Sequence, residues 1–248
     1  MNPSSVSVIV PAKDAAAFVA TTLESLTRQV EDRARLEVVV VDDGSRDGTG
    51  EVVESYRSRL GALTVLRNDR PVGLASARNQ GLAAARSRHV AFLDADDWLA
   101  PGRLEVLSAR LDALGCAFLR TDHVAVTGTT RALVRAPQAR RETVLDPRGS
   151  VLPHLESTMV DYPYAWAGLF DREQVADDVL RFPEGLFTAE DRPWIWGLHL
   201  RTGSYAVVDA PPLLYRRSVA TSSRGNHRAS SVVPFTSAVS SPPTMRAS

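Results

Sequence analysis

The amino-acid sequence predicts an α/β fold built around a mostly parallel sheet. In residues 1–115, short runs of apolar and β-branched residues alternate with segments whose apolar residues recur at helical spacing. Strands that are separated by helices form βαβ units, in which successive strands run parallel. The chain of 248 residues, 44% of them hydrophobic, is long enough to bury a sizeable core.

Each element of the first half follows from a local pattern. Runs rich in valine, leucine and isoleucine predict strands at residues 6–10, 36–41, 63–66 and 89–93. The first strand is expected to end at Pro11, because proline has no N–H group to give to a sheet. Apolar or small residues at helical spacing predict helices at residues 15–29, 73–85 and 103–114, and a helix that begins at Asp47 or Thr49.

The second half has a more mixed pattern. The elements expected there are a hairpin at 124–135 around Gly128, a helix start at Asp146-Pro147, an aromatic segment and helix within 162–180, a helix at 189–201, and short strands at 204–209 and 213–216. Residues 218–248 contain nine serines and no acidic residue, a composition typical of a disordered or loosely packed tail.

The composition excludes several classes of protein. The 29 basic and 29 acidic residues cancel, so no global cationic field for nucleic acid or anionic lipid is expected. Cys116 is the only cysteine, which rules out an internal disulfide and a multi-cysteine zinc site. The sequence has neither an apolar run long enough for a transmembrane helix nor the basic start of a signal peptide, so a cytoplasmic protein is expected.

Acidic clusters follow two of the predicted strands. Asp42 and Asp43 come directly after the second strand, and residues 94–97 (D-A-D-D) come after the fourth. In open α/β sheets, ligands bind beyond the carboxyl ends of the strands. The carboxylates of Asp94 and Asp96 can converge on Mg²⁺ or Mn²⁺, which also bind substrate phosphates. Taken alone, such a cluster is better explained as a solvated turn or a helix cap.

Four other residues stand out in the sequence. Arg78 is either a surface arginine of an amphipathic helix or a guanidinium that faces an anionic nucleotide pocket. Asp191 begins a predicted helix, where the helix dipole favours an ionised carboxylate, and taken alone it is plausible as an N-cap. Trp194 and Trp196 are expected on different faces of that helix, one in the core and the other at an acceptor pocket.

Four segments of the first half resemble family 2 glycosyltransferases, in that family's order and spacing. They are V-S-V-I-V-P-A-K at residues 6–13, E-V-V-V-V-D-D-G-S-R-D-G-T at 37–49, G-L-A-S-A-R-N-Q-G at 73–81 and F-L-D-A-D-D-W-L-A-P-G-R-L at 92–104. Together these segments are far more specific than any one of them alone.

The second half is more loosely similar to the family. Residues 164–172 (Y-A-W-A-G-L-F-D-R) are similar to a segment of its acceptor-side region, and Glu190-Asp191 is similar to its E-D motif. The stretch 212–222 is similar to its P-L-x-Y-Y-R-x-H-x-x-S ending, but this chain has no histidine at the matching place. Arg216 or Arg217 would then contact the diphosphate instead.

The resemblance implies a GT-A fold, a nucleotide-sugar donor, Mg²⁺ or Mn²⁺ as cofactor, and inversion at the anomeric carbon. It implies one domain at residues 1–217, with a nucleotide-sugar-binding half at 1–115 and an acceptor-side half at 116–217, followed by the tail. Asp191 would be the general base. The donor-binding residues implied are Pro11, Asp42, Asp43, Arg78, Asp94 and Asp96, of which Asp96 and Asp94 would hold the metal. Those implied to contact the acceptor or the diphosphate are Glu190, Trp166, Arg216 and Arg217.

The same resemblance implies the reaction partners. The donor would be a UDP-, GDP- or dTDP-sugar, and the acceptor a glycan, a polyol or a lipid-linked molecule of cell-surface polysaccharide, teichoic-type polymer or glycolipid synthesis. Such an acceptor would bring a cytoplasmic protein to the inner face of the membrane without a spanning segment.

Two other functions stay open: a non-catalytic relative that binds the nucleotide-sugar, and another nucleotide-dependent transferase such as a nucleotidyltransferase. A haloacid-dehalogenase-type phosphohydrolase is disfavoured, because the D-x-D run follows the fourth predicted strand and not the first. A dinucleotide oxidoreductase is disfavoured, because no G-x-G-x-x-G follows the first strand.

Overall fold

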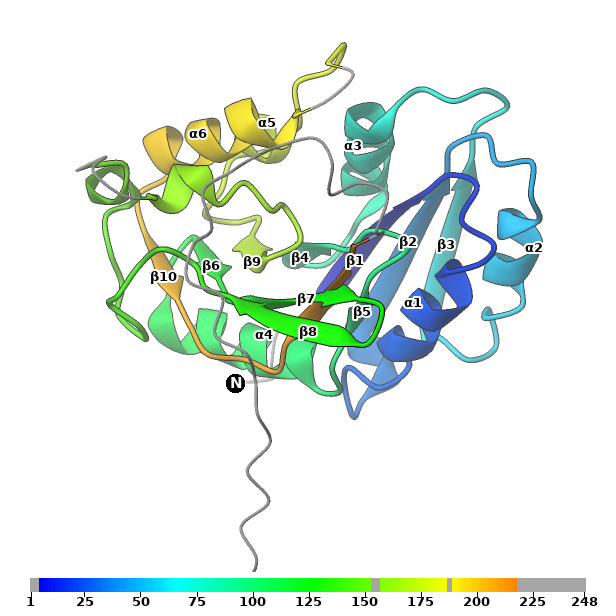
Figure 1. Cartoon of the computed structure of the whole chain (residues 1–248), viewed down its shortest axis with the longest axis horizontal. Helices are drawn as coiled ribbons and strands as arrows, with labels where there is room; N and C mark the ends of the chain where they lie inside the picture. Colours follow the sequence, from blue (N-terminus) through cyan, green and yellow to red (C-terminus); the bar gives the residue numbers. More distant parts are fainter. Residues whose placement is uncertain (1–4, 153–156, 187–188, 218–248) are drawn as a thin grey trace, which may run out of the picture.

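One seven-stranded sheet runs through both halves of the sequence (Figure 1). A computed structural model describes residues 5–152, 157–186 and 189–217, so the tail expected at 218–248 lies outside the described residues. The strand order is β10-β6-β9-β4-β1-β2-β3. The strands are β1 (Val6–Ala12), β2 (Leu36–Asp42), β3 (Ala62–Arg67), β4 (His89–Phe92), β6 (Phe118–Arg120), β9 (Gly168–Asp171) and β10 (Tyr205–Val207).

Most strand pairs in this sheet are parallel, as the sequence predicts. β1 pairs in parallel with β2 and β4, β2 with β3, and β6 with β10. β9 runs antiparallel to both of its neighbours, β4 and β6, and so joins the strands of the second half to those of the first. In Figure 1 the strands of the first half, blue to cyan, continue into the green and orange strands of the second.

Helices pack around this sheet. They are α1 (Val19–Leu26), α2 (Thr49–Glu54), α3 (Leu74–Ala84), α4 (Arg103–Leu114), α5 (Asp177–Leu180) and α6 (Asp191–Arg201). The helix expected at 15–29 is shorter and begins at Val19, and the N–H groups of Ala15 and Ala16 before it bond to the side chains of Thr49 and Asp47. Three 3₁₀ turns complete the set, at Arg33–Arg35, Pro147–Ser150 and Met159–Asp161. No helix within the described ranges is long and apolar enough to cross a membrane.

A second, four-stranded sheet has the order β5-β11-β7-β8. Its strands are β5 (Trp98–Leu99), β7 (His123–Thr127), β8 (Thr130–Val134) and β11 (Leu213–Arg216). The antiparallel pair β7 and β8 confirms the hairpin predicted around Gly128, whose φ is +57°. β11 brings the end of the described chain beside β5, which directly follows the acidic cluster at 94–97.

Pro11 does not end β1, contrary to the prediction. The strand continues to Ala12 and pairs with β2 over its whole length, whereas its pairing with β4 stops at Ile9. Ile9 faces β4, since its carbonyl accepts from the N–H of Leu93, and alternate residues of a strand face the same neighbour. Pro11 therefore also faces the β4 side, where the ladder has ended and no N–H group is needed.

α3 lies unusually close to β1. A Cβ atom at Gly81 would be only 2.4 Å from Cγ2 of Ile9, so this distance requires glycine. Arg78 lies three residues earlier, on the same face of the helix. The close packing of α3 thus directs the Arg78 side chain over the sheet, and Arg78 is 1% exposed.

α6 lies over the other half of the sheet and confirms the expected split of its tryptophans. Trp194 is 2% exposed and packs against Phe92 and Phe170, whereas Trp196 is 43% exposed. The predicted place of a tryptophan at an acceptor pocket stays a prediction. Cys116 is fully buried, as expected for a small apolar residue.

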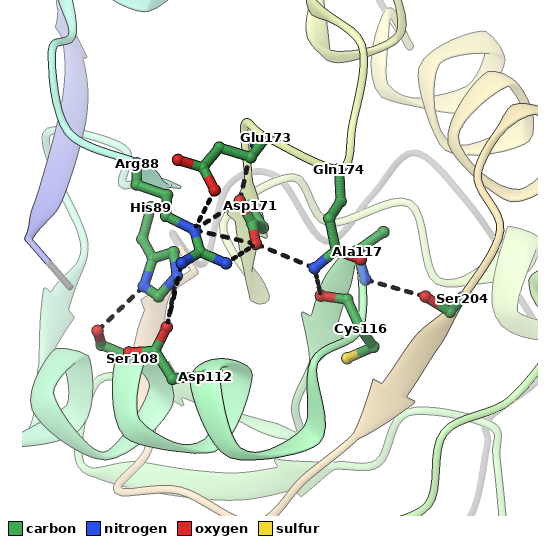
Figure 2. Close-up of polar contacts among 10 residues, drawn as sticks. All are labelled: Arg88, His89, Ser108, Asp112, Cys116, Ala117, Asp171, Glu173, Gln174 and Ser204. Atoms are coloured by element: carbon green, nitrogen blue, oxygen red, sulfur yellow. Dashed lines mark hydrogen bonds and ion pairs between the residues drawn. The ribbon is translucent and has the colours of Figure 1, made fainter. Parts of the chain in front are cut away.

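Ionic contacts hold the antiparallel strand β9 at the amino end of β4 (Figure 2). Nη2 of Arg88 lies 2.7 Å from Oδ2 of Asp171, the last residue of β9. The neighbouring His89 is fully buried, and its Nδ1 is 3.0 Å from Oγ of Ser108 on α4. Burial lowers the pKa of His89, which favours the neutral ring. These contacts tie β9, β4 and α4 together at the edge opposite to the acidic clusters.

Candidate active site

A cleft of about 310 Å³ opens beyond the carboxyl ends of β1 and β4. Three residues predicted to bind the donor line it, namely Pro11, Asp94 and Asp96. The other lining residues are Lys13, Asp14, Ala15, Phe18, Leu74 and Ala95. The cleft lies where the topology of a parallel sheet places a ligand, because β1 and β4 are adjacent and end at the same edge.

Asp43 fixes the loop that leads into α3. Its carboxylate accepts hydrogen bonds from Nδ2 of Asn68 at 2.9 Å and from the N–H groups of Val72 and Gly73 at 2.8 and 2.9 Å. This loop precedes Leu74, which lines the cleft. The predicted contact between Asp43 and a nucleotide base stays a prediction.

Asp42 does not face the cleft, which corrects the expectation that it contacts the donor. Its side chain is fully buried, and Oδ1 accepts a hydrogen bond from the N–H of Ser45 at 2.9 Å. Arg67 on β3 places Nε 3.7 Å from Oδ2. Asp42 and Asp43 are consecutive at the end of an extended strand, so their side chains point in opposite directions. Asp42 therefore stabilises the turn after β2 from within.

Arg78 joins the two sides of the site. Its Nη2 lies 2.9 Å from Oδ1 of Asp94, and its Nη1 lies 2.6 Å from Oδ1 of Asp191 and 3.1 Å from Oε1 of Glu190. Burial opposes its charge, but the carboxylates of Asp94 and Asp191 raise the pKa of Arg78 above its ordinary value. Arg78 is thus not a surface residue, which corrects that interpretation from the sequence; it is the shared counter-ion of these carboxylates. Its predicted place beside the donor stays a prediction.

Asp191 is held at the first turn of α6. The N-cap of the helix is Glu190, so the alternative interpretation of Asp191 as the N-cap is wrong. Ala189, just before this pair, has φ +61°, a value that non-glycine residues seldom adopt. Burial raises the pKa of Asp191 to about 6, although the charge of Arg78 opposes this shift. A carboxyl with that pKa can accept and release a proton near neutral pH.

Asp94 and Asp96 fit a hard divalent cation. Both line the cleft, and burial together with the negative charge of Asp94 raises the pKa of Asp96. A cation between the two carboxylates would relieve that repulsion. Nucleotide sites hold Mg²⁺ with one or two carboxylates and the substrate phosphates. The described residues contain no cluster of three or more acidic, histidine or cysteine residues that could hold a metal, so donor phosphates would have to complete the coordination.

Arg216 braces this acidic loop from β11. Its Nε donates to the carbonyl of Asp96 at 2.9 Å, and its N–H donates to Oδ1 of Asp97 at 2.7 Å. The guanidinium lies over the rings of Phe18 and Trp98, at 5.0 and 4.8 Å from their centroids. Asp97 is fully buried, and burial together with the charge of Asp94 raises its pKa to about 9, so it is a neutral acid at pH 7.

Trp166 packs in the core, and its implied contact with an acceptor or a diphosphate stays a prediction. It is 4% exposed, and its ring is stacked between those of Tyr164 and Tyr215, at 4.7 and 5.0 Å. The two tyrosines keep partly exposed edges. Arg217 follows β11, is exposed, and donates its N–H to the carbonyl of Val126 at 2.8 Å. Its predicted contact with a diphosphate or an acceptor stays a prediction.

Sequence reasoning missed several residues that shape this site. Lys13 lines the cleft, and its place just after a predicted strand could have indicated it, by the rule that singled out Asp94. Asn79 and Phe182 support Arg78 and α6 through contacts described below. No local pattern marks these two residues, because their partners lie about a hundred positions away in the sequence.

Known proteins share this fold. The crystal structure of residues 1–349 of TarS from S. aureus matches with a TM-score of 0.71 and 27% identity, over 86% of this chain and 60% of that chain. The same TarS fragment in complex with UDP-GlcNAc matches with a TM-score of 0.72, over 86% of this chain and 58% of that chain. These matches confirm the GT-A fold.

Sequence comparison gives the same relationship. The glycosyltransferase EpsJ of Bacillus subtilis is 29% identical over 220 residues, which cover 86% of this chain and 61% of EpsJ. TarS of Staphylococcus aureus, a poly(ribitol-phosphate) beta-N-acetylglucosaminyltransferase, is 28% identical over 92% of this chain and 37% of TarS. The chain therefore spans less than two thirds of the length of these relatives. The glycosyl transferase family 2 model matches residues 7–209, and the chain accordingly belongs to glycosyl transferase family 2.

Proposed function

We propose that this chain transfers a sugar from a nucleotide-sugar donor to an acceptor hydroxyl, with inversion at the anomeric carbon and with Asp191 as the general base. The observation that carries the proposal is the convergence of Asp94, from the cleft, and Asp191, from α6, on the two Nη atoms of Arg78. Arg78 thus holds Asp94, on the donor side, close to Asp191, on the proposed acceptor side.

Inversion requires one in-line displacement, in which an acceptor oxygen attacks the anomeric carbon and loses its proton. In the described residues only Oδ1 of Asp191 has a hydrogen-bond partner, so Oδ2 is available to accept that proton. Arg78 holds the carboxylate in one orientation. When bound, Mg²⁺ or Mn²⁺ supplies positive charge that stabilises the leaving nucleoside diphosphate. Asp94 and Asp96 are the residues that would hold this ion.

For the donor we propose a nucleoside diphosphate sugar, with a UDP-sugar as the first to test, because the matching TarS fragment was crystallised with UDP-GlcNAc and with UDP. For the acceptor we propose a hydroxyl of a cell-surface polymer or of its lipid-linked precursor, on the cytoplasmic face of the membrane. The TarS name, which gives poly(ribitol-phosphate) as acceptor, supports this class.

Substitution of Asp96 tests the donor site. The protein is incubated with Mn²⁺ and a panel of UDP-, GDP- and dTDP-sugars, and the release of nucleoside diphosphate is measured. Asp96→Ala is expected to lower this release about a hundredfold, because the leaving group loses a stabilising charge of several kcal/mol. Asp209→Asn removes an exposed carboxylate after β10 and serves as the matched control, with unchanged release. Donor binding without release under any condition, acceptor mixtures included, would instead identify a non-catalytic binder.

The pH profile tests the base. Because the pKa of Asp191 is raised to about 6, its proton-accepting form is lost as the pH falls through 6. We expect kcat/KM for the acceptor to rise about tenfold per pH unit below that value and to level off above it. The dissociation constant of the donor is measured over the same range to separate binding from proton transfer. A kcat/KM that stays flat down to pH 5 would contradict the assignment of Asp191.

A further inference from the structure

The side-chain amide of Asn79 clamps a backbone segment that lies beside α6. Asn79 follows Arg78 on α3 and is 3% exposed. Its Oδ1 accepts the N–H of Phe182 at 2.8 Å, while its Nδ2 donates to the carbonyl of Phe182 and to Oε1 of Glu184, both at 2.9 Å. Both N–H groups of the amide and its oxygen are therefore used, which only an asparagine at this position can achieve.

Asn79 bonds both the N–H and the carbonyl of Phe182, and the ring of Phe182 contacts three other side chains of the site. Its ring stacks on Trp194 of α6, with centroids 4.8 Å apart and an angle of 11° between the planes. It meets Phe92 of β4 edge-on at 5.2 Å. The guanidinium carbon of Arg78 lies 5.0 Å from the ring centroid. Phe182 therefore supports α6 and the Arg78 guanidinium at the same time.

These contacts fix the orientation of α6. Trp194 lies three residues after Asp191, and residues at this spacing share one side of a helix. The indole is held by Phe182 and by a hydrogen bond from its Nε1 to the carbonyl of Leu180 at 3.0 Å. A rotation of α6 that moved Asp191 would have to break this stack. The position of Asp191 is thus determined by Arg78 directly and by Asn79 through Phe182.

We propose that Asn79 is a positioning residue for Asp191, which acts by holding Phe182 between Arg78 and Trp194. The expected effect on kcat rests on the proposed function, whereas the expected effect on the position of α6 does not. Asn79 is not among the residues that line the cleft, and within the described residues its side chain bonds to Phe182 and Glu184 and to neither Asp94 nor Asp96. Its loss should therefore impair the reaction step more than donor binding.

The test replaces the amide by a carboxylate of the same shape. Asn79→Asp turns two donated bonds into repulsion with the carbonyl of Phe182 and with Glu184. We expect kcat to fall about 10–100-fold through misplacement of the base, while the dissociation constant of a UDP-sugar stays within about twofold. Adding Glu184→Gln should recover part of kcat, because the new amide can donate to the new carboxylate while the repulsion from the carbonyl of Phe182 remains. Glu184→Gln alone keeps an oxygen acceptor for Asn79 and should behave like the wild type.

Gln29, which follows α1, supplies a matched control. It is also buried, and its amide likewise donates two bonds and accepts one, from Nε2 to the carbonyls of Ser25 and Ala100 and to Oε1 from the N–H of Leu104. Gln29→Glu makes the same chemical change as Asn79→Asp. It is expected to lower thermal stability similarly and to leave kcat within about twofold.

Hydrogen–deuterium exchange supplies a measurement that is independent of activity. In Asn79→Asp, the hydrogen-bonded amides of α6 at residues 195–201 are expected to exchange at least about tenfold faster, while those of β1 stay unchanged. Gln29→Glu should leave α6 exchange as in the wild type. The proposal is overturned if α6 exchange does not change in Asn79→Asp, or if kcat and donor affinity fall together and Glu184→Gln restores neither. Should the wild type transfer no sugar at all, the proposed function fails, and the exchange data still decide the role of Asn79.

Discussion

Asp191→Asn is expected to lower kcat by about 10²–10⁴-fold, the range that a positioned general base contributes. The amide keeps the size of the side chain and an oxygen that can accept from Arg78, but it cannot take the acceptor proton. The dissociation constant of the donor, measured by calorimetry with Mn²⁺ present, should stay within about twofold, because Asp191 does not line the cleft. Loss of donor binding in this variant would refute the assignment.

The pH dependence of Asp191→Asn adds a second criterion. The limb with an apparent pKa near 6 should disappear from the kcat/KM profile, since the titrating group is gone. A residual rate that keeps this limb would assign the proton to another group. Glu190 is the neighbouring carboxylate on the same guanidinium and would then be the next candidate.

Arg78→Met is expected to lower the free energy of unfolding by about 3–5 kcal/mol, because it leaves partly buried carboxylates without their shared cation. The carboxylates concerned are Asp94, Glu190 and Asp191. Arg78→Lys keeps the charge, but a single ammonium group cannot contact all three carboxylates at once. We therefore expect an intermediate loss in the free energy of unfolding. The free energies of unfolding of the wild type, Arg78→Met and Arg78→Lys are measured by urea unfolding at pH 7.5.

Arg57→Met is the control for this experiment. Arg57 pairs with Glu54 at 2.8 Å on the surface, where both side chains are more than half exposed and water screens the pair, so the loss of Arg57 should cost much less stability than the loss of Arg78. The sign of the pH effect gives a further check. The charge of Arg78 lowers the pKa of Asp191, so in a folded Arg78→Met protein the kcat/KM limb should move to higher pH, and by less in Arg78→Lys, which keeps the charge. An unfolding free energy like that of the control would contradict the network.

The sequence predicts well what depends on local pattern and on the topology of parallel strands. The strands that carry Asp43 and Asp94 were recognisable as buried apolar runs, and their carboxyl ends meet at one edge because β2, β1 and β4 are adjacent and parallel. The position of the cleft follows from this topology. Helical periodicity predicts a helix over 189–201, and α6 begins two residues later, at Asp191.

Contacts between distant segments could not be predicted in this way. Arg78 and Asp191 are 113 positions apart, and nothing near either residue indicates that they are partners. Pairing of this kind depends on how the second half returns over the first, which a single sequence does not encode in a readable pattern. The alternation of side chains along a strand could have separated Asp42 from Asp43, but not decided which of them is buried.

The position of β9 has a consequence for how the chain acquires its structure. β4 borders β1 on one side, and its other side is covered only by β9, which ends at Asp171. While the protein is being synthesised, the first half therefore emerges with an unpaired edge strand, of the kind that recruits other chains. Closure of the sheet awaits a partner some eighty residues downstream, and such non-local pairing folds slowly. Within the described residues, the first half alone would therefore present β4 as an exposed sheet edge until β9 pairs with it.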